Sequence, residues 1–177
     1  MDSEDIALIG ILLACGAITH LVASFFATPL VFNFAISFYC LAIILTTPKI
    51  EEALGIGIAA GVIFALVSHS VCPLANLISE PVGAFVCLTI YVLLGRYTSH
   101  SASAATFYAT CASGFIFILV SLLLAGDVIL SQYNSFLAFF IEASPIVLGT
   151  ALVNVLLTGL LLRLVTRLII FSELSEF

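Results

Sequence analysis

Basic residues are scarce in this chain: 177 residues include only four Lys and Arg, and charged residues of both signs make up 8%. Because 63% of the residues are hydrophobic, too little polar surface remains to cover a soluble domain of this length. A basic patch for nucleic acid is missing. No Gly-Lys-Ser/Thr phosphate-binding loop occurs either, so the chain has no P-loop ATPase of its own. The composition predicts one integral membrane domain, 1–177, embedded in the lipid bilayer.

Catalytic and metal-binding patterns are also missing. The five cysteines form no C-x-x-C pair, and four of them lie inside apolar runs, where cysteine packs as a small apolar residue. A disulfide or metal role is the minor alternative. Neither an H-E-x-x-H motif nor a Ser/His/Asp arrangement occurs, so we expect no enzyme and no cofactor. The alternative is a metal or proton site formed by His20 and His69 with Glu80 or Glu142.

The apolar residues fall into six runs, each near the roughly 20 residues that a helix needs to cross a bilayer. The expected spans are 6–26, 30–46, 53–71, 81–95, 102–125 and 144–170. Pro29, Pro48 and Pro81 mark three of the breaks, because the residue before a proline avoids helical backbone. The fourth run is short and alternatively begins near Leu77. The apolar stretch 136–141 is either an interfacial segment or an extension of the last helix.

The few basic residues predict an orientation. With six spans, one side of the membrane receives every basic residue: Lys49, Arg96, Arg163 and Arg167. Cytoplasmic loops and ends collect Lys and Arg, so we expect both termini to be cytoplasmic, in the plasma membrane. The acidic N-terminal residues lack the positive region of a signal peptide, which makes the first run a retained span. The expected fold is therefore an all-α, polytopic membrane protein with six transmembrane helices, N-in and C-in.

Small residues recur at helical spacing in two of the spans. In the first span they are Ala7, Gly10, Ala14 and Ala17, and in the third span Ala53, Gly57, Gly61 and Ala65. Such rows let a second helix approach closely within a membrane. Each row is either an internal helix contact or a docking surface for a partner protein.

The predicted outer side holds amides and acids without a single Lys or Arg. Its candidate ligand-binding residues are Asn33, His69, Asn76, Glu80 and Glu142, with Asn154 deeper in the last span. This set suits a small organic ligand with an apolar body and an amine. Two of the residues have ordinary alternatives. Glu142 is either a functional charge near the membrane or a solvated carboxylate at a helix start, and Asn154 is either a ligand contact or a helix–helix hydrogen bond.

Residues 33–94 carry a family resemblance. An apolar stretch, NFAISFYCLAIIL (33–45), is followed by a Pro-Lys turn and then by LGIGIAAGVIFAL (54–66). A polar loop with Pro73, Asn76-Leu-Ile78 and Pro81 comes next. This order resembles the tryptophan-transporter-like membrane proteins, which are similar to the S-components of energy-coupling factor transporters. One departure is that Ser79-Glu80 stands where that group has an acidic-basic pair.

The resemblance implies an integral substrate-binding subunit that captures a small nutrient from outside. It would work with a second, transmembrane coupling subunit and two cytoplasmic ATPases, and the first span's small residues would meet that partner. The ligand would lie among the outer loops and the outer ends of the last three spans, close to Asn33, Asn76, Glu80 and Glu142. A structural or accessory subunit of a larger complex, without a ligand, is the alternative from another class. A proton-coupled carrier ranks third, because no acid lies clearly within a predicted span.

Overall fold

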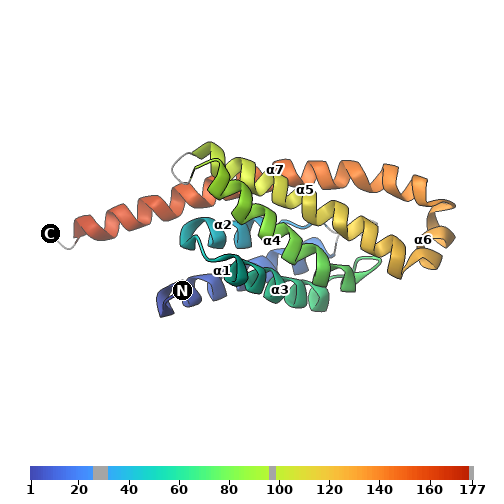
Figure 1. Ribbon diagram of the computed structural model, residues 1–177, viewed down its shortest axis with the longest axis horizontal. Helices are drawn as coiled ribbons and strands as arrows, with labels where there is room; N and C mark the ends of the chain where they lie inside the picture. The colour runs from blue at the N-terminus through green and yellow to red at the C-terminus, as the bar shows by residue number, and fades with distance from the viewer. Residues whose placement is uncertain (26–31, 96–98, 176–177) are drawn as a thin grey trace.

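Helices make up nearly all of the described chain (Figure 1). The structure is a computed structural model that describes residues 1–25, 32–95 and 99–175, with side chains up to Arg167 apart from that of Ser99. In these ranges the elements are α1 (Ser3–Ala23), α2 (Ile36–Thr46), α3 (Ile50–Val67), the 3-10 helix η1 (Pro73–Ala75), α4 (Asn76–Leu93), α5 (Ser99–Leu124), α6 (Gly126–Tyr133) and α7 (Phe136–Ser175). The predicted breaks at Pro29 and Arg96 lie outside the described residues.

The described helices have the length and surface of a multi-pass membrane protein. Five segments are long and apolar enough to cross a bilayer: Ser3–Ala23, Ile50–Val67, Pro73–Leu93, His100–Leu124 and Phe136–Arg167. Large apolar side chains such as Leu66 (81% exposed) and Leu123 (83% exposed) project from the bundle. Surfaces of this kind are stable against lipid tails and unstable in water. The all-α, polytopic membrane fold is therefore confirmed.

The predicted second span has a different form. Its helix, α2, has only 11 residues, which is about 16 Å of a hydrocarbon core about 30 Å thick. Eight of its residues are buried, so α2 is surrounded by its neighbours instead of facing lipid along its length. An apolar run is equally suited to the lipid bilayer and to the protein interior. The sequence of this run therefore predicts a full span even though α2 is enclosed by other helices. The count of six spans and the N-in, C-in orientation stay predictions.

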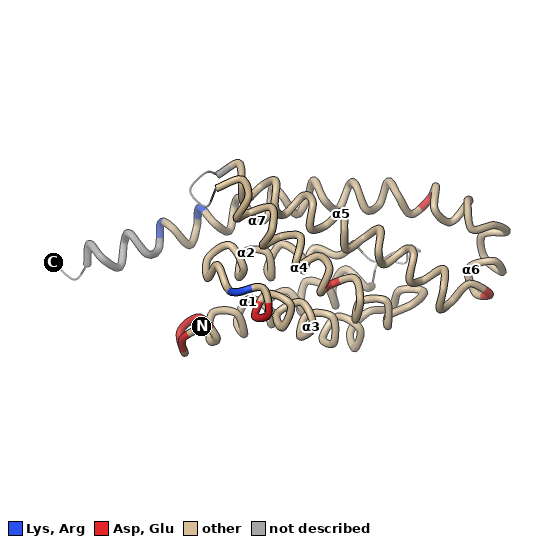
Figure 2. The backbone as a smooth tube through the Cα atoms, in the orientation of Figure 1, with Lys and Arg blue, Asp and Glu red and all other residues tan. Residues whose placement is uncertain are grey.

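Contacts between helices define how the chain runs. His20 on α1 stacks on Phe64 of α3 near the ends of both helices, so α1 and α3 are parallel. Each later long helix reverses the direction of the one before it, and α2 runs parallel to α7, with Ser37 beside Thr158. Both termini consequently lie at one end of the bundle and α6 at the other (Figure 1). The described Lys and Arg residues lie at the end with the termini, whereas acidic residues also occur elsewhere (Figure 2).

Two prolines at or near the starts of predicted spans lie inside helices. Pro81 is the sixth residue of α4, which begins at Asn76 as the alternative start near Leu77 implied. Pro145 lies within α7, which also takes in the 136–141 segment. Membrane helices tolerate proline because neighbouring groups satisfy the freed backbone. The polar residues around Ser131, which follow the predicted fifth span, belong to the short helix α6.

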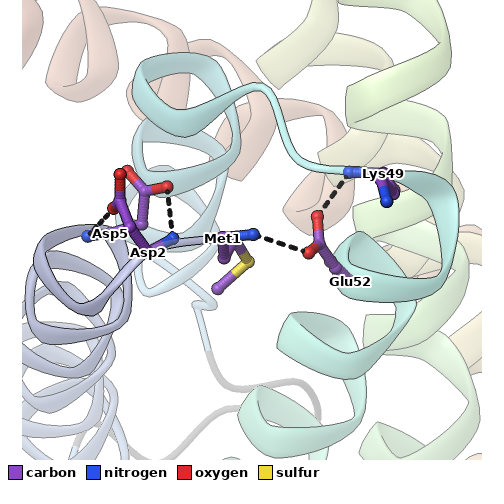
Figure 3. Close-up of polar contacts among 5 residues, drawn as sticks. All are labelled: Met1, Asp2, Asp5, Lys49 and Glu52. Atoms are coloured by element: carbon purple, nitrogen blue, oxygen red, sulfur yellow. Dashed lines mark hydrogen bonds and ion pairs between the residues drawn. The ribbon is translucent and has the colours of Figure 1, made fainter.

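Polar contacts fix the first turns of α1 and α3 at the end that holds the termini (Figure 3). The Met1 α-amino group donates to Glu52 Oε1 at 3.0 Å, and Glu52 Oε2 accepts the Lys49 N–H at 2.8 Å. Asp2 and Asp5 cap α1 reciprocally through their side chains and backbone N–H groups. The hydrogen bond from Met1 to Glu52 raises the pKa of the amino group, which preserves its charge beside the carboxylate.

The two rows of small residues have opposite environments. On α3, Gly57 and Gly61 are buried against α4: a Cβ on Gly57 would lie 2.6 Å from Pro81 Cα, and one on Gly61 would lie 2.6 Å from the Asn76 carbonyl oxygen. Of the two alternatives for this row, an internal helix contact and a partner interface, Gly57 and Gly61 form the internal contact, because α4 already occupies that face. On α1, Ala7, Gly10 and Ala14 are exposed and Ala17 is half-buried.

Candidate functional site

A partly open cavity lies in the half of the bundle remote from the termini, and its empty space, counted together with its opening to solvent, is about 450 Å³. Its walls come from α1, α2, α4, α5, α7 and the segments flanking α2 and α3. The lining residues are His20, Asn33, Ile36, Ser68, Ser70, Asn76, Glu80, Thr110, Ser113, Gly114, Phe117, Ile146, Val147 and Thr150. Nine of these 14 side chains are polar, which is unusual inside a bundle whose outer surface is apolar. A small ligand is the natural occupant of such a space.

Glu80 is the acidic residue of the cavity. Its position in the second turn of α4 leaves the side chain 0% exposed, within the bundle. The Asn33 side-chain amide donates to Glu80 Oε1 at 2.6 Å. Among the described residues Glu80 Oε2 accepts no hydrogen bond, although the hydroxyl-bearing side chains of Tyr39 and Ser113 adjoin the carboxyl group. A buried carboxyl oxygen without a partner is costly in a folded protein, so this oxygen is a candidate ligand contact.

Glycine lets the neighbours of Glu80 come close. A Cβ on Gly83 would contact the Tyr39 hydroxyl and lie 3.0 Å from Ser113 Cβ. Gly57, from the opposite side, brings α3 to the Glu80 carbonyl oxygen, 3.0 Å from where a Cβ would be. Three helices therefore converge on the α4 turn that carries Glu80, and their packing fixes its position.

Asn154 holds the segment before α2 against α5 and α7. Its side-chain amide donates to the Asn33 carbonyl oxygen at 2.9 Å and to Thr110 Oγ1 at 3.2 Å. Asn154 is fully buried and is not among the residues that line the cavity. Of the two predicted roles of Asn154, a ligand contact and a helix–helix hydrogen bond, the structure has the hydrogen bond, from α7 to Thr110 of α5. Asn154 also positions Asn33, whose side-chain amide donates to Glu80.

His20 lines the cavity, although the sequence predicted it only as part of the alternative metal or proton site. Its ring is 2% exposed and stacks on Phe64 with a centroid distance of 5.1 Å. Neither ring nitrogen makes a hydrogen bond within the described part of the chain. No group of three His, Cys, Asp or Glu residues is close enough to hold a metal ion among the residues described. His20 is therefore available to a ligand as a single polar contact.

The structure separates the six predicted ligand-binding residues into two groups. Asn33, Asn76 and Glu80 line the cavity, and Asn154 contacts two of its residues. His69 and Glu142 do not line it: both are exposed. His69 follows the end of α3 and has its ring 6.2 Å from that of Phe25.

Glu80 lies inside a helix and is buried, not in the outer loop where it was predicted. The sequence placed it in an outer loop before a span that began at Pro81, whereas η1 and α4 begin the helical segment earlier and bury it. The statement that no acid lies within a span is therefore wrong. Hydroxyl residues of α5 and α7, namely Thr110, Ser113 and Thr150, were not predicted as lining. Thr110 and Ser113 are three residues apart on α5, and this helical spacing was the available signal, although apolar neighbours conceal it.

Comparison with known proteins supports one relationship. No protein-family model matches the chain, and no solved structure matches it. The chain is similar to a protein of Bacillus subtilis (strain 168) named "Probable tryptophan transport protein", with 27% identity over 128 residues, which is 71% of this chain and 74% of that protein. The predicted resemblance to the tryptophan-transporter-like proteins is thereby confirmed.

Proposed function

We propose, starting from that likeness to a tryptophan-transporter-like protein, that this chain binds a small amino-acid-like or vitamin-like nutrient for uptake across the plasma membrane. The observation that carries the proposal is the cavity, in which Glu80 Oε2 and both nitrogens of His20 are buried without partners among the described residues. A structural subunit has no need of such a space. The relative, which is similar over 71% of this chain, is named a probable tryptophan transport protein, and that name supports a ligand of this kind.

The direction of uptake follows from charge. The cavity is in the half of the bundle opposite the termini, and the described Lys and Arg residues are at the end with the termini (Figure 2). If basic residues mark the cytoplasmic side, the cavity belongs to the outer half of the membrane. A ligand then enters from outside and meets the polar groups of α4 and α5.

The finer proposal is that the chain is a substrate-binding subunit of the energy-coupling factor type. It would work with a transmembrane coupling subunit and cytoplasmic ATPases, because the sequence has no P-loop with which to use ATP itself. The surface for the coupling subunit would be the small-residue face of α1. Ala7, Gly10 and Ala14 are exposed there, and a Cβ on Gly10 would meet no atom within 4 Å.

Ligand binding and transport by the purified chain test the proposal in two steps. We expect the chain in detergent to bind tryptophan or a related small nutrient in calorimetry, and Glu80→Gln to weaken that binding. Glu142→Gln is the matched control, because it removes the same charge from an exposed position on α7 outside the cavity. Absence of binding across amino acids and vitamins would contradict the proposal and favour the structural subunit.

One observation favours a second candidate, a self-contained proton-coupled carrier. Glu80 is a fully buried acid inside a membrane helix, and such acids form proton relays in carriers. Proteoliposomes containing only this chain distinguish the two candidates. Uptake driven by an imposed pH gradient would establish the carrier. Binding without uptake, followed by uptake once a coupling subunit and ATPases are added, would establish the binding subunit.

A further inference from the structure

We propose that the cavity recognises its ligand through a primary ammonium group, which binds between Glu80 and Asn33, while the apolar body of the ligand lies against α5 and α7. This inference rests on the proposed ligand-binding function and names the class of ligand. It also leaves the carboxylate of an amino acid, if one is present, without an ionic partner.

The charges of the cavity define which ligand group fits. Its 14 lining residues include one carboxyl group and no Lys or Arg. Arg163 is the nearest described cation along α7, nine residues beyond Asn154, which is about 13 Å along a helix. A ligand anion would therefore meet Glu80 without a compensating cation. A ligand cation would meet an acid of opposite charge in a site of low dielectric, where the attraction is strong.

The groups around Glu80 include two buried acceptors without a partner among the described residues, although the Tyr39 and Ser113 hydroxyls adjoin the carboxyl group and His20 adjoins the Asn33 side chain. Glu80 Oε2 and Asn33 Oδ1 are both buried without a hydrogen bond in the described part of the chain. The Asn33 amide that donates to Glu80 Oε1 is held in place through its backbone by Asn154. An ammonium group has three donors and no acceptor, so it complements this pair. Ser113, which lines the cavity beside Glu80, offers a third oxygen.

A metal cation is the other occupant with positive charge, and the donor set does not suit it. Tight cation sites gather several carboxylate or imidazole ligands. Among the described residues no three His, Cys, Asp or Glu side chains come together. Among the described lining residues, Glu80 is the only carboxylate and His20 the only imidazole.

Part of the cavity wall is apolar and belongs to other helices. Ile36, Phe117, Ile146 and Val147 line it, and Gly114 leaves room on α5 where a side chain would collide with Val147. These apolar side chains share the cavity with the polar groups around Glu80, and α5 and α7 also contribute the hydroxyls of Thr110, Ser113 and Thr150. A ligand with an ammonium group at one end and an aliphatic or aromatic body at the other satisfies both kinds of group.

A set of matched compounds tests the ammonium site on the unmodified protein. Calorimetry with the full chain in detergent would use ligands with three different apolar bodies, namely an indolyl, a phenyl or an isobutyl group. Each is offered as the amino acid, as the amine without a carboxylate, and as the acid without an amine. We expect the amino acid and the amine of at least one body to bind and its acid to bind at least 100-fold more weakly, about 2.7 kcal/mol.

The outcomes separate this inference from the proposed function. An acid that binds as tightly as its amino acid would overturn the ammonium site and leave ligand binding intact. Failure of all nine compounds to bind would overturn the ammonium site, whereas the proposed function is overturned only if the wider set of amino acids and vitamins also fails to bind. Glu80→Gln is expected to lower amine affinity about 100-fold, since it removes one partner of a buried charge pair, with Glu142→Gln unchanged. If Glu80→Gln does not fold, the compound series on the unmodified chain still decides.

Discussion

Replacing Gly57 with alanine is expected to force α3 away from α4 and lower the stability of the bundle. The added Cβ would lie 2.6 Å from Pro81 Cα, 2.9 Å from Ala84 Cβ and 3.0 Å from the Glu80 carbonyl oxygen. Carbon atoms pack best at 3.5–4.0 Å, so the two helices have to part by roughly 1 Å. Two of the three contacts are backbone atoms, which cannot rotate away as the end of a side chain can.

The magnitude follows from two opposing effects. Overpacking a tight contact costs about 1–3 kcal/mol, while alanine in place of glycine favours a helix by about 1 kcal/mol. Gly55→Ala on the same helix carries only the gain in helix propensity, because Gly55 is exposed and a Cβ there meets nothing within 4 Å. The difference in stability between the two variants therefore isolates the cost of overpacking. Gly57→Ala should therefore be about 1–3 kcal/mol less stable than Gly55→Ala, a Tm difference of roughly 2–12 °C for a chain of this size.

Thermal unfolding of the two purified variants in the same detergent checks this expectation, with tertiary fluorescence or differential scanning calorimetry as the readout. Ligand affinity gives a second readout, because the contact at Gly57 also fixes the turn that carries Glu80. Equal Tm values for Gly57→Ala and Gly55→Ala would refute the tight α3–α4 contact and with it the internal assignment of this glycine row.

Three further predictions concern the cavity support, the free face of α1 and the exposed acid. Asn154→Ala should lower Tm by an amount equivalent to about 1–3 kcal/mol, because two hydrogen bonds from α7, to the segment before α2 and to α5, of up to about 1.7 kcal/mol each are lost. Thr89→Ala is the control, because the Thr89 hydroxyl donates to the Phe85 carbonyl oxygen of its own helix, and an equal effect of both variants would contradict the role of Asn154. Gly10→Leu should not lower Tm, since the position is open and leucine favours a helix over glycine, yet it should reduce uptake by a reconstituted transporter; normal uptake would argue against a partner on this face. Glu142→Gln should leave ligand affinity unchanged in calorimetry, because the side chain lies outside the cavity; a loss of affinity would show that the binding site extends to the start of α7.

The sequence by itself determined that the chain is a helical membrane protein, because apolar runs of sufficient length have few other stable structures in lipid. It also marked Asn33, Asn76 and Glu80, since polar residues beside apolar runs are visible in any reading of the chain. The internal role of Gly57 and Gly61 was one of two alternatives, because a small residue is equally suited to an internal neighbour and to a partner.

Only the tertiary structure decided which polar groups face each other. Asn33 and Glu80 are 47 residues apart and Asn33 and Asn154 are 121 apart, so their contacts depend on how α2, α4, α5 and α7 pack. The burial of Glu80 depends on where α4 begins. The sequence predicted that start at Pro81, whereas α4 begins at Asn76 and includes Pro81, because neighbouring helices let a proline lie within a membrane helix. The sequence likewise could not predict that α2 is short and enclosed by other helices, since apolar residues are favoured equally by lipid and by a protein core. Local sequence fixes the apolar helices, and the packing between distant segments forms the cavity.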